Sequence, residues 1–219
     1  MKANRKLSRN PRISGIRSPR LIVIASEGMH TEKIYFEDMA SVKYYRNPGV
    51  HVEVLERDET ASSPEHVIIT LDNYRKKYSL TLNKDDELWL VIDRDRWKLR
   101  ELSSVATKCY QKSFLLACSN PCFELWLLLH IKSLSDYSKT ELDDLTKNKH
   151  VSRKRTLLEQ EIINIIGSYN KQNPDTSKFL PFVETAISRA RTLDSTPTDR
   201  WPNCLGTRVY KLAESILNR

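Results

Sequence analysis

The chain lacks any apolar run of the roughly 20 residues that a membrane-spanning helix requires. Its longest candidate, residues 123–131, is short and contains Glu124 and His130. The basic N-terminus is not followed at once by the apolar core of a secretion signal, and LIVIAS at 21–26 is too short for one. These absences exclude the integral membrane class, and we expect a cytoplasmic protein that does not contact membranes.

Cysteine and catalytic motifs are also scarce. The four cysteines form no CxxC pair and the five histidines do not fall at zinc-finger spacing, which argues against a structural zinc site. We interpret Cys118 and Cys122 as small buried side chains. No GxxxxGK[ST] loop and no GxSxG elbow occurs, so neither a Walker nucleotide site nor this hydrolase type is predicted. Ser119 and His130 are expected to have structural roles.

Positive charge is concentrated at the N-terminus. The net charge is +8, and residues 1–20 carry seven Lys or Arg and no acid, so the rest of the chain is near +1. Residues 1–19 are therefore predicted to form a basic, flexible arm. Two interpretations stay open for it: salt-dependent contact with nucleic-acid phosphates, or a solubilising tail.

The first 132 residues alternate between strand and helix patterns. Strands are predicted from β-branched and apolar runs at 21–28, 48–56, 86–95 and 113–120. Helices are predicted between and after them, at 31–45, 63–78, 98–109 and from Ser119-Asn120-Pro121 to about 132. Such alternation is typical of an α/β protein with a mainly parallel sheet flanked by helices on both faces.

The character of the sequence changes after residue 133. This part is polar at first, then helical from about 153, at 180–193 and again near the C-terminus, and it contains no strong strand signal. We predict a division into an α/β core at 20–132 and a mainly helical extension at 133–219, which completes or packs on the core.

Acidic residues follow two of the predicted strands. Glu27 follows the first strand, Asp93 and Asp95 end the third, and Glu124 lies in the first turn of the helix after the fourth. Ligands of open parallel sheets bind outside the carboxyl ends of the strands, so these side chains are expected to converge there. Alternation along an extended strand would place Asp93 and Asp95 on the same side.

Converging carboxylates repel one another unless cations lie among them. Oxygen ligands without a cysteine or histidine cluster favour Mg²⁺ or Mn²⁺, and such a site suits phosphoryl transfer. A simpler interpretation is also open, because acids after strands often end the strand, cap a helix or pair with nearby arginines, here Arg94, Arg96 and Arg100.

Three blocks around these acids resemble one protein family. VIASEGMHTEKIYF, LWLVIDRDRW and LACSNPCFELWLLLH are similar, in this order, to the signature blocks of RloB-like proteins, a Toprim-fold group of abortive-infection and phage-defence proteins that includes AbiLii-like members. The likeness covers about residues 20–132, with a looser match in NCLGTRVYKLAESIL.

The resemblance implies a Toprim-like site and a set of partners. By position, Glu27 matches the first Toprim acid, Asp93 and Asp95 match the DxD pair, and Glu124 matches an additional family acid. Glu32 would support these acids from one helical step further in. Divalent metal, a DNA or RNA substrate and a separately encoded ATPase of the AAA or ABC-like type are implied, and a homo-oligomer stays open.

The function expected from residues and resemblance together is a metal-dependent nuclease that acts as the effector of a phage-defence system. It would hydrolyse DNA or RNA, with tRNA among the RNA targets. The alternative is a non-catalytic nucleic-acid-binding or regulatory subunit of the partner ATPase. The basic residue that contacts the phosphate is open among Arg94, Arg96, Lys98, Arg153, Lys154 and Arg155, although the run 153–155 also suits the solvated start of a helix.

Overall fold

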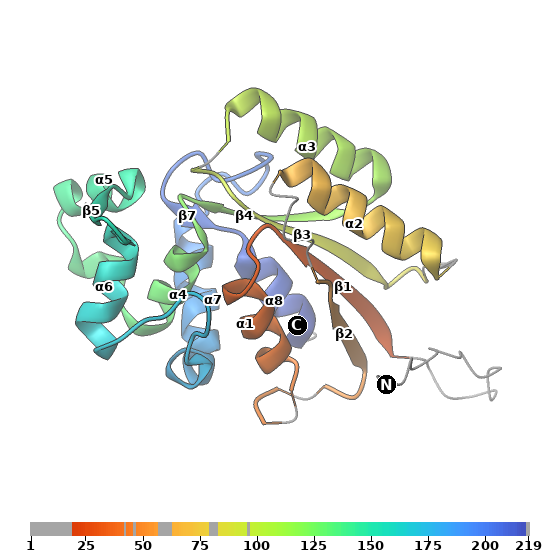
Figure 1. Ribbon diagram of the computed structural model, residues 1–219, viewed down its shortest axis with the longest axis horizontal. Helices are drawn as coiled ribbons and strands as arrows, with labels where there is room; N and C mark the ends of the chain where they lie inside the picture. The colour runs from red at the N-terminus through yellow and green to blue at the C-terminus, as the bar shows by residue number, and fades with distance from the viewer. Residues whose placement is uncertain are drawn as a thin grey trace.

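The computed structural model describes residues 19–217, apart from Val42, Arg46, 57–62, 79–82 and Arg96. The basic arm expected at 1–19 therefore lies almost entirely outside the described residues. The first half alternates strand and helix as expected (Figure 1). Its elements are β1 (Arg20–Ser26), α1 (Thr31–Met39), β2 (Val50–Val54), α2 (Pro64–Lys77), β3 (Glu87–Asp93), α3 (Leu99–Lys112), β4 (Leu115–Asn120) and α4 (Phe123–Ile131).

The main sheet has five strands in the order β2-β1-β3-β4-β7, where β7 is Gly206–Thr207. The first four strands are mutually parallel and β7 is antiparallel to β4. In this register Ile24 lies between Val54 and Trp89, and Asp93 lies opposite Ser119. The continuous apolar runs of β1 and β3 place these strands in the centre, because central strands are covered on both faces. The predicted α/β class with a mainly parallel, Toprim-like sheet is confirmed.

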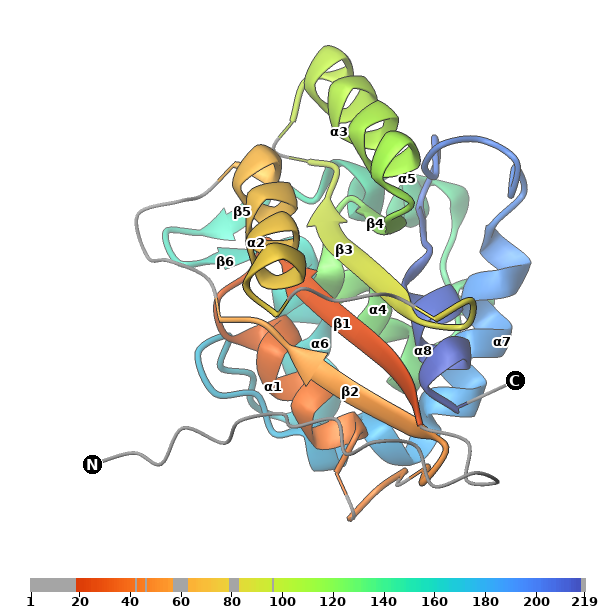
Figure 2. The ribbon, with the colours of Figure 1, turned by 90° about the vertical axis from the view of Figure 1, so that its right-hand side faces the viewer.

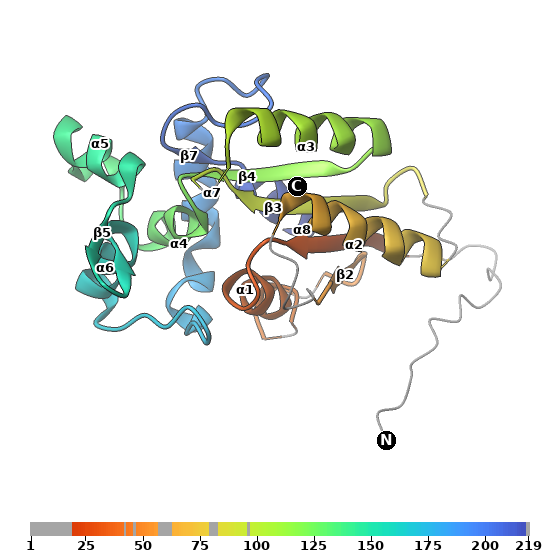
Figure 3. The ribbon, with the colours of Figure 1, turned by 45° about the horizontal axis from the view of Figure 1, so that its top comes forward.

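Helices cover both faces of the sheet, as the three views show (Figures 1, 2 and 3). One face packs on α2 and α3 through a core that includes Val23, Leu90 and Leu102. The other face shares a larger core with α1, α4 and helices of the second half, in which Ile24, Val91 and Trp126 are buried. The β-strand alternation sends successive side chains to these two cores. No helix in the described ranges is both long enough and apolar enough to cross a membrane.

The second half contains the expected helices. It also contains three short strands, which the sequence did not predict. Its elements are η1 (Leu134–Asp136), α5 (Lys139–Lys147), β5 (His150–Ser152), β6 (Arg155–Thr156), α6 (Leu157–Ile166), η2 (Thr176–Lys178), η3 (Leu180–Phe182), α7 (Val183–Leu193), β7 and α8 (Val209–Leu217). The helix expected from about 153 is α6, and it begins four residues later because residues up to Thr156 belong to the β5–β6 hairpin. The three short strands were not expected, since this part of the sequence carries no strong strand signal. Strands of two or three residues are too short for a periodic pattern, and β7 exists only because it pairs with β4.

His130 and Ser119 have the structural roles expected of them. Nδ1 of His130 lies 2.8 Å from the Trp126 carbonyl and therefore donates to it, so Nε2 accepts from the Tyr35 hydroxyl at 2.9 Å. Burial lowers the pKa of His130 to about 3, which keeps this internal imidazole neutral. Ser119 shares a buried hydrogen bond of 2.8 Å with Thr207, and this bond joins β4 to β7.

A buried ion pair fixes the chain around β7. Arg208 directly follows β7, and its Nε lies 3.1 Å from Oδ2 of Asp194, at the end of α7. Only 4% of the Arg208 side chain and 2% of the Asp194 side chain are exposed. Arg208 also donates to the carbonyl of Thr196 at 2.6 Å, and the hydroxyl of Tyr210 donates to Asp194 at 3.0 Å. This network joins α7, β7 and α8 at the antiparallel edge of the sheet.

Replacement of this arginine tests the network. We expect Arg208→Met to lower the free energy of unfolding by about 3–5 kcal/mol, because it removes the closer cation of the buried Asp194 carboxylate and leaves only Lys211, at 3.9 Å. Urea unfolding followed by circular dichroism measures the change. Lys147→Met is the matched control, since Lys147 and Asp144 form a pair whose side chains are each 55% exposed, and a change within about 1 kcal/mol is expected there. Equal effects of the two substitutions would contradict the prediction.

Candidate active site

Glu27 begins an acidic cluster at the carboxyl ends of β1 and β3. It directly follows β1, its backbone N–H donates to the Val91 carbonyl of β3 at 2.9 Å, and it is only 4% exposed. Its Oε2 accepts the indole N–H of Trp97 at 2.9 Å and lies 3.4 Å from the backbone nitrogen of Asp93. Glu27 is therefore held in place by the residues that follow the neighbouring strand.

Asp93 is the last residue of β3 and contributes the second carboxylate. Alternation from Trp89 and Val91 directs it to the sheet face that α1 and α4 cover. Its Oδ1 is buried and has no hydrogen-bond partner among the described residues. A buried carboxylate oxygen without a donor is costly, so this atom is an available ligand for a cation.

Glu32, in the first turn of α1, is part of the same cluster. It is 6% exposed. Gly28 makes room for it, since a Cβ at position 28 would lie 1.8 Å from Oε2 of Glu32. Its carboxylate therefore occupies the space over the turn that follows β1. The supporting position expected for Glu32 agrees with this placement, but the need for Gly28 could not be predicted, because it depends on how the Glu32 side chain folds back over the turn.

Burial, together with repulsion among the acids, raises the pKa of Glu32 and of Asp93. Burial, followed by the charges of Glu124 and Glu27, raises the pKa of Glu32 from 4.5 to about 7, although a backbone hydrogen bond and Lys171 oppose this shift. Burial and the charges of Glu32, Glu124 and Glu27 raise the pKa of Asp93 well above its ordinary value. Carboxylates whose charges raise each other's pKa values lie near one another. Of the acids expected to converge, Glu27 and Asp93 are in direct contact, and Glu124 is near enough for its charge to raise the pKa of Asp93.

Glu124 lies in the first turn of α4 and is 2% exposed. Its Oε1 is 2.9 Å from Nζ of Lys171 and accepts from the hydroxyl of Tyr169 at 3.2 Å. The same ammonium is 2.8 Å from Oε1 of Glu159, on α6. Sequence reasoning missed Tyr169, Lys171 and Glu159, because they lie in a polar loop and on a helix with no motif, and only the packing of the second half brings them to Glu124.

Asp95 does not extend β3. The strand ends at Asp93, and the backbone N–H groups of Arg94 and Asp95 donate to the carbonyl of Pro121, each at 3.1 Å. Asp95 is an exposed residue of this turn, so the argument from strand alternation does not apply to it. Its charge still raises the pKa of Asp93, as the weakest of the four neighbouring acids that do so.

The basic candidates lie in two separate parts of the structure. Arg94 lies in the turn after β3, and Lys98 is exposed immediately before α3, while Arg96 is outside the described residues. The other three belong to the hairpin of β5 and β6, with Arg153 and Lys154 in its turn and Arg155 in β6. The predicted helix start at 153–155 is therefore corrected to an exposed β-hairpin.

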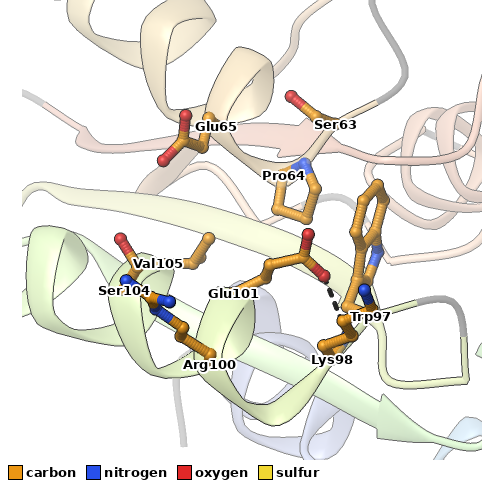
Figure 4. A pocket seen from close by; sticks show the side chains of 9 residues that line it. All are labelled: Ser63, Pro64, Glu65, Trp97, Lys98, Arg100, Glu101, Ser104 and Val105. Carbon is orange, nitrogen blue, oxygen red and sulfur yellow. Dashed lines mark hydrogen bonds between the residues drawn. The ribbon is translucent and has the colours of Figure 1, made fainter.

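A cleft of about 530 Å³ lies beside Trp97, between the N-terminal ends of α2 and α3 (Figure 4). Pro64, Trp97, Lys98 and Arg100 contribute to its walls. Glu101, also in the lining, accepts a hydrogen bond of 2.9 Å from the backbone of Lys98. Trp97 links the cleft to the acids, since its ring lines the cleft while its N–H binds Glu27.

The donor chemistry of the cluster fits a hard divalent cation such as Mg²⁺ or Mn²⁺. All donors are carboxylate oxygens, and Oδ1 of Asp93 has no partner in the described chain. Within the same described ranges, no three acidic, histidine or cysteine side chains are already arranged as a metal site. The contacts of Glu27 with Trp97 and of Glu124 with Lys171 give the physical reason, because both carboxylates are engaged by other donors.

Comparison with models of protein families identifies the family to which the chain belongs. The model of the family described as RloB-like protein matches residues 22–216. The chain belongs to the RloB-like family. A search of curated proteins and a search of solved structures each found no match.

The match confirms the resemblance seen in the three blocks and extends it. It covers the elements from β1 to α8 and so includes the second half of this RloB-like protein, where the blocks gave only a loose likeness. Lys171 and Glu159 thus lie inside the family-matched region together with the acidic residues.

The pKa of Glu32 makes the stability of the metal-free protein depend on pH. The folded state binds more protons than the unfolded state between about pH 4.5 and 7, so the free energy of unfolding should fall as the pH rises through this window. We expect Glu32→Gln to remove part of this fall and to raise stability at pH 8 by about 1–3 kcal/mol.

Urea unfolding in EDTA at pH 5 and pH 8 measures this difference. Glu37→Gln is the control, because Glu37 lies on the same helix with a half-exposed side chain. A fall in stability that is as large in Glu32→Gln as in the unmodified protein would show that Glu32 does not carry the effect.

Proposed function

We propose that this RloB-like protein is a metal-dependent nuclease that hydrolyses phosphodiester bonds in DNA or RNA as the effector of a phage-defence system. The observation that carries the proposal is the cluster of Glu27, Glu32, Asp93 and Glu124, which come from three separate parts of the chain: the connection from β1 into α1, the end of β3 and the first turn of α4. Burial of carboxylates that repel one another lowers the stability of the fold, so a functional reason is expected for keeping them together. Such strain is typical of sites that bind cations or perform chemistry.

Glu27, Asp93 and Glu124 would hold Mg²⁺ or Mn²⁺, with Asp95 at the outer side of the site. A bound divalent ion would stabilise the charge that develops on the phosphate oxygens during hydrolysis. The protein would supply the position of the ligands. Trp97 fixes the orientation of Glu27, and the end of β3 fixes the backbone of Asp93.

The β5–β6 hairpin would offer a basic surface to the nucleic acid. Residues 149–155 are all exposed and include Lys149, Arg153, Lys154 and Arg155. The hairpin leads directly into α6, where the backbone of Thr156 donates to Oε2 of Glu159 at 3.1 Å. Since Oε1 of Glu159 contacts Lys171, which contacts Glu124, the base of the hairpin is connected to the acidic cluster.

The alternative function is a non-catalytic nucleic-acid-binding or regulatory subunit. One observation favours it: in the described residues no three ligands are ready to hold an ion. Both functions are compatible with a separately encoded ATPase partner, which we propose from the family resemblance because the sequence has no Walker motif of its own. A cytoplasmic location is proposed because the sequence contains no membrane-spanning run and no signal core, and a homo-oligomer stays open.

Replacement of Asp93 separates the two functions. We expect the purified protein to cleave labelled plasmid DNA or total tRNA with Mg²⁺ or Mn²⁺ but not with EDTA, and Asp93→Asn to lose about 100-fold or more of this activity. Mn²⁺ binding, measured by calorimetry, should weaken in parallel. Asp85→Asn is the matched control, since Asp85 is exposed just before β3, at the opposite end of the same strand. Equal metal binding by Asp93→Asn and the unmodified protein would overturn the proposed site.

Charge removal from the hairpin tests the nucleic-acid surface. The triple variant Arg153→Ala, Lys154→Ala and Arg155→Ala should bind both polymers more weakly and lower the slope of log K against log [salt] by about 2–3. The control removes the same charge from Lys76, Lys77 and Lys84, which are exposed at the opposite edge of the sheet. A salt slope that falls equally in both triple variants would indicate non-specific attraction rather than a surface at the hairpin.

A further inference from the structure

Lys171 places a positive charge inside the acidic cluster. The residue lies in the loop between α6 and η2, and its ammonium lies 2.9 Å from Oε1 of Glu124 and 2.8 Å from Oε1 of Glu159. One cation thus bridges two carboxylates that come from different helices. No sequence motif marks this contact, and the proposed nuclease chemistry does not require it.

The loop that carries Lys171 is fixed to the helices of the site. The hydroxyl of Thr31, beside Glu32 on α1, donates to the backbone carbonyl of Lys171 at 2.7 Å. The hydroxyl of Tyr169 donates to Glu124 at 3.2 Å, and that of Thr176 donates to Asp38 on α1 at 2.5 Å. With its backbone held on α1, only the side chain of Lys171 has to move for its charge to change place.

Burial differs strongly between the lysine and its partners. The side chains of Glu124 and Glu159 are 3% and 8% exposed, whereas that of Lys171 is 47% exposed. Burial opposes the charge of Lys171, but attraction by Glu124 and hydrogen bonds to both glutamates raise its pKa above the ordinary value. Lys171 is therefore a cation that can turn towards water, while the two carboxylates stay buried and need a positive partner.

We propose that Lys171 is an internal counter-cation of the acidic site, which competes with a divalent metal ion for Glu124. The inference rests on the proposed metal-dependent function. A metal ion and an ammonium group that share one buried carboxylate repel each other. Binding of the ion at Glu124 therefore requires Lys171 to withdraw towards Glu159 or solvent. Before this movement, the ammonium group pairs with Glu124 and prevents a metal ion from binding to this carboxylate.

Metal affinity of Lys171 variants tests this competition. Calorimetric titration with Mn²⁺ alone should show about tenfold tighter binding for Lys171→Met than for the unmodified protein, since a competing charge is removed. Lys171→Arg keeps the charge and should stay within about threefold of the unmodified protein. Lys178→Met is the control, since Lys178 is an exposed lysine of the same segment. Unchanged or weaker binding by Lys171→Met would overturn the proposal.

A double variant covers the case in which Lys171→Met does not fold. Lys171→Met with Glu159→Gln removes one charge of each sign, so no carboxylate at position 159 is left without a partner. It should also bind Mn²⁺ several-fold more tightly, and Mn²⁺ should raise its melting temperature more than that of the unmodified protein. A purely structural ion pair would lower the melting temperature of the variant without enlarging this metal-induced increase, which would also overturn the proposal.

The two proposals fail in different ways. If neither the unmodified protein nor any lysine variant binds Mn²⁺, the metal site itself is wrong and the role of Lys171 falls with it. If the unmodified protein binds Mn²⁺, Asp93→Asn does not, and Lys171→Met binds like the unmodified protein, then the metal site stands and only the competition is wrong.

Discussion

Repulsion among buried carboxylates is the constraint on which the site of this protein depends. Burial, followed by the charges of neighbouring acids among Glu27, Glu32, Asp93 and Glu124, raises the pKa values of Glu32 and Asp93. Such a cluster persists only if the surrounding fold holds it and positive charge is available to it. The fold meets the first condition with the ends of two central strands and the first turns of two helices. Lys171 supplies part of the positive charge.

The sheet order explains why these acids meet. Since β1 and β3 are neighbours, Glu27 and the end of β3 lie side by side, and Trp97 joins them with one hydrogen bond. Helices α1 and α4 pack on the same face of the sheet, so their first turns begin beside the same strand ends. The family match over residues 22–216 shows that this arrangement includes the second half of the chain, which contributes the lysine and the basic hairpin.

The proposed role of Lys171 links the stability of the metal-free site to its affinity for a metal ion. A cation that is part of the chain keeps buried carboxylates paired when no metal ion is bound, which limits the loss of stability. The same cation makes metal binding harder by electrostatic repulsion. If Glu124 binds a metal ion as proposed, stability without metal and affinity for metal would be opposed there, and the half-exposed side chain of Lys171 would adjust between them.

The sequence by itself determined the alternating strands and helices of the first half, the mainly parallel sheet and the acids at its carboxyl edge, because apolar runs and strand ends are local patterns. It placed Glu27, Asp93 and Glu124 correctly at this edge but treated Asp95 as part of a strand that in fact ends at Asp93. Only the tertiary structure decided the two-residue strand β7, the β5–β6 hairpin, and the contact of Lys171 with Glu124 and Glu159. These features depend on contacts between residues far apart in the chain, which no local periodicity encodes.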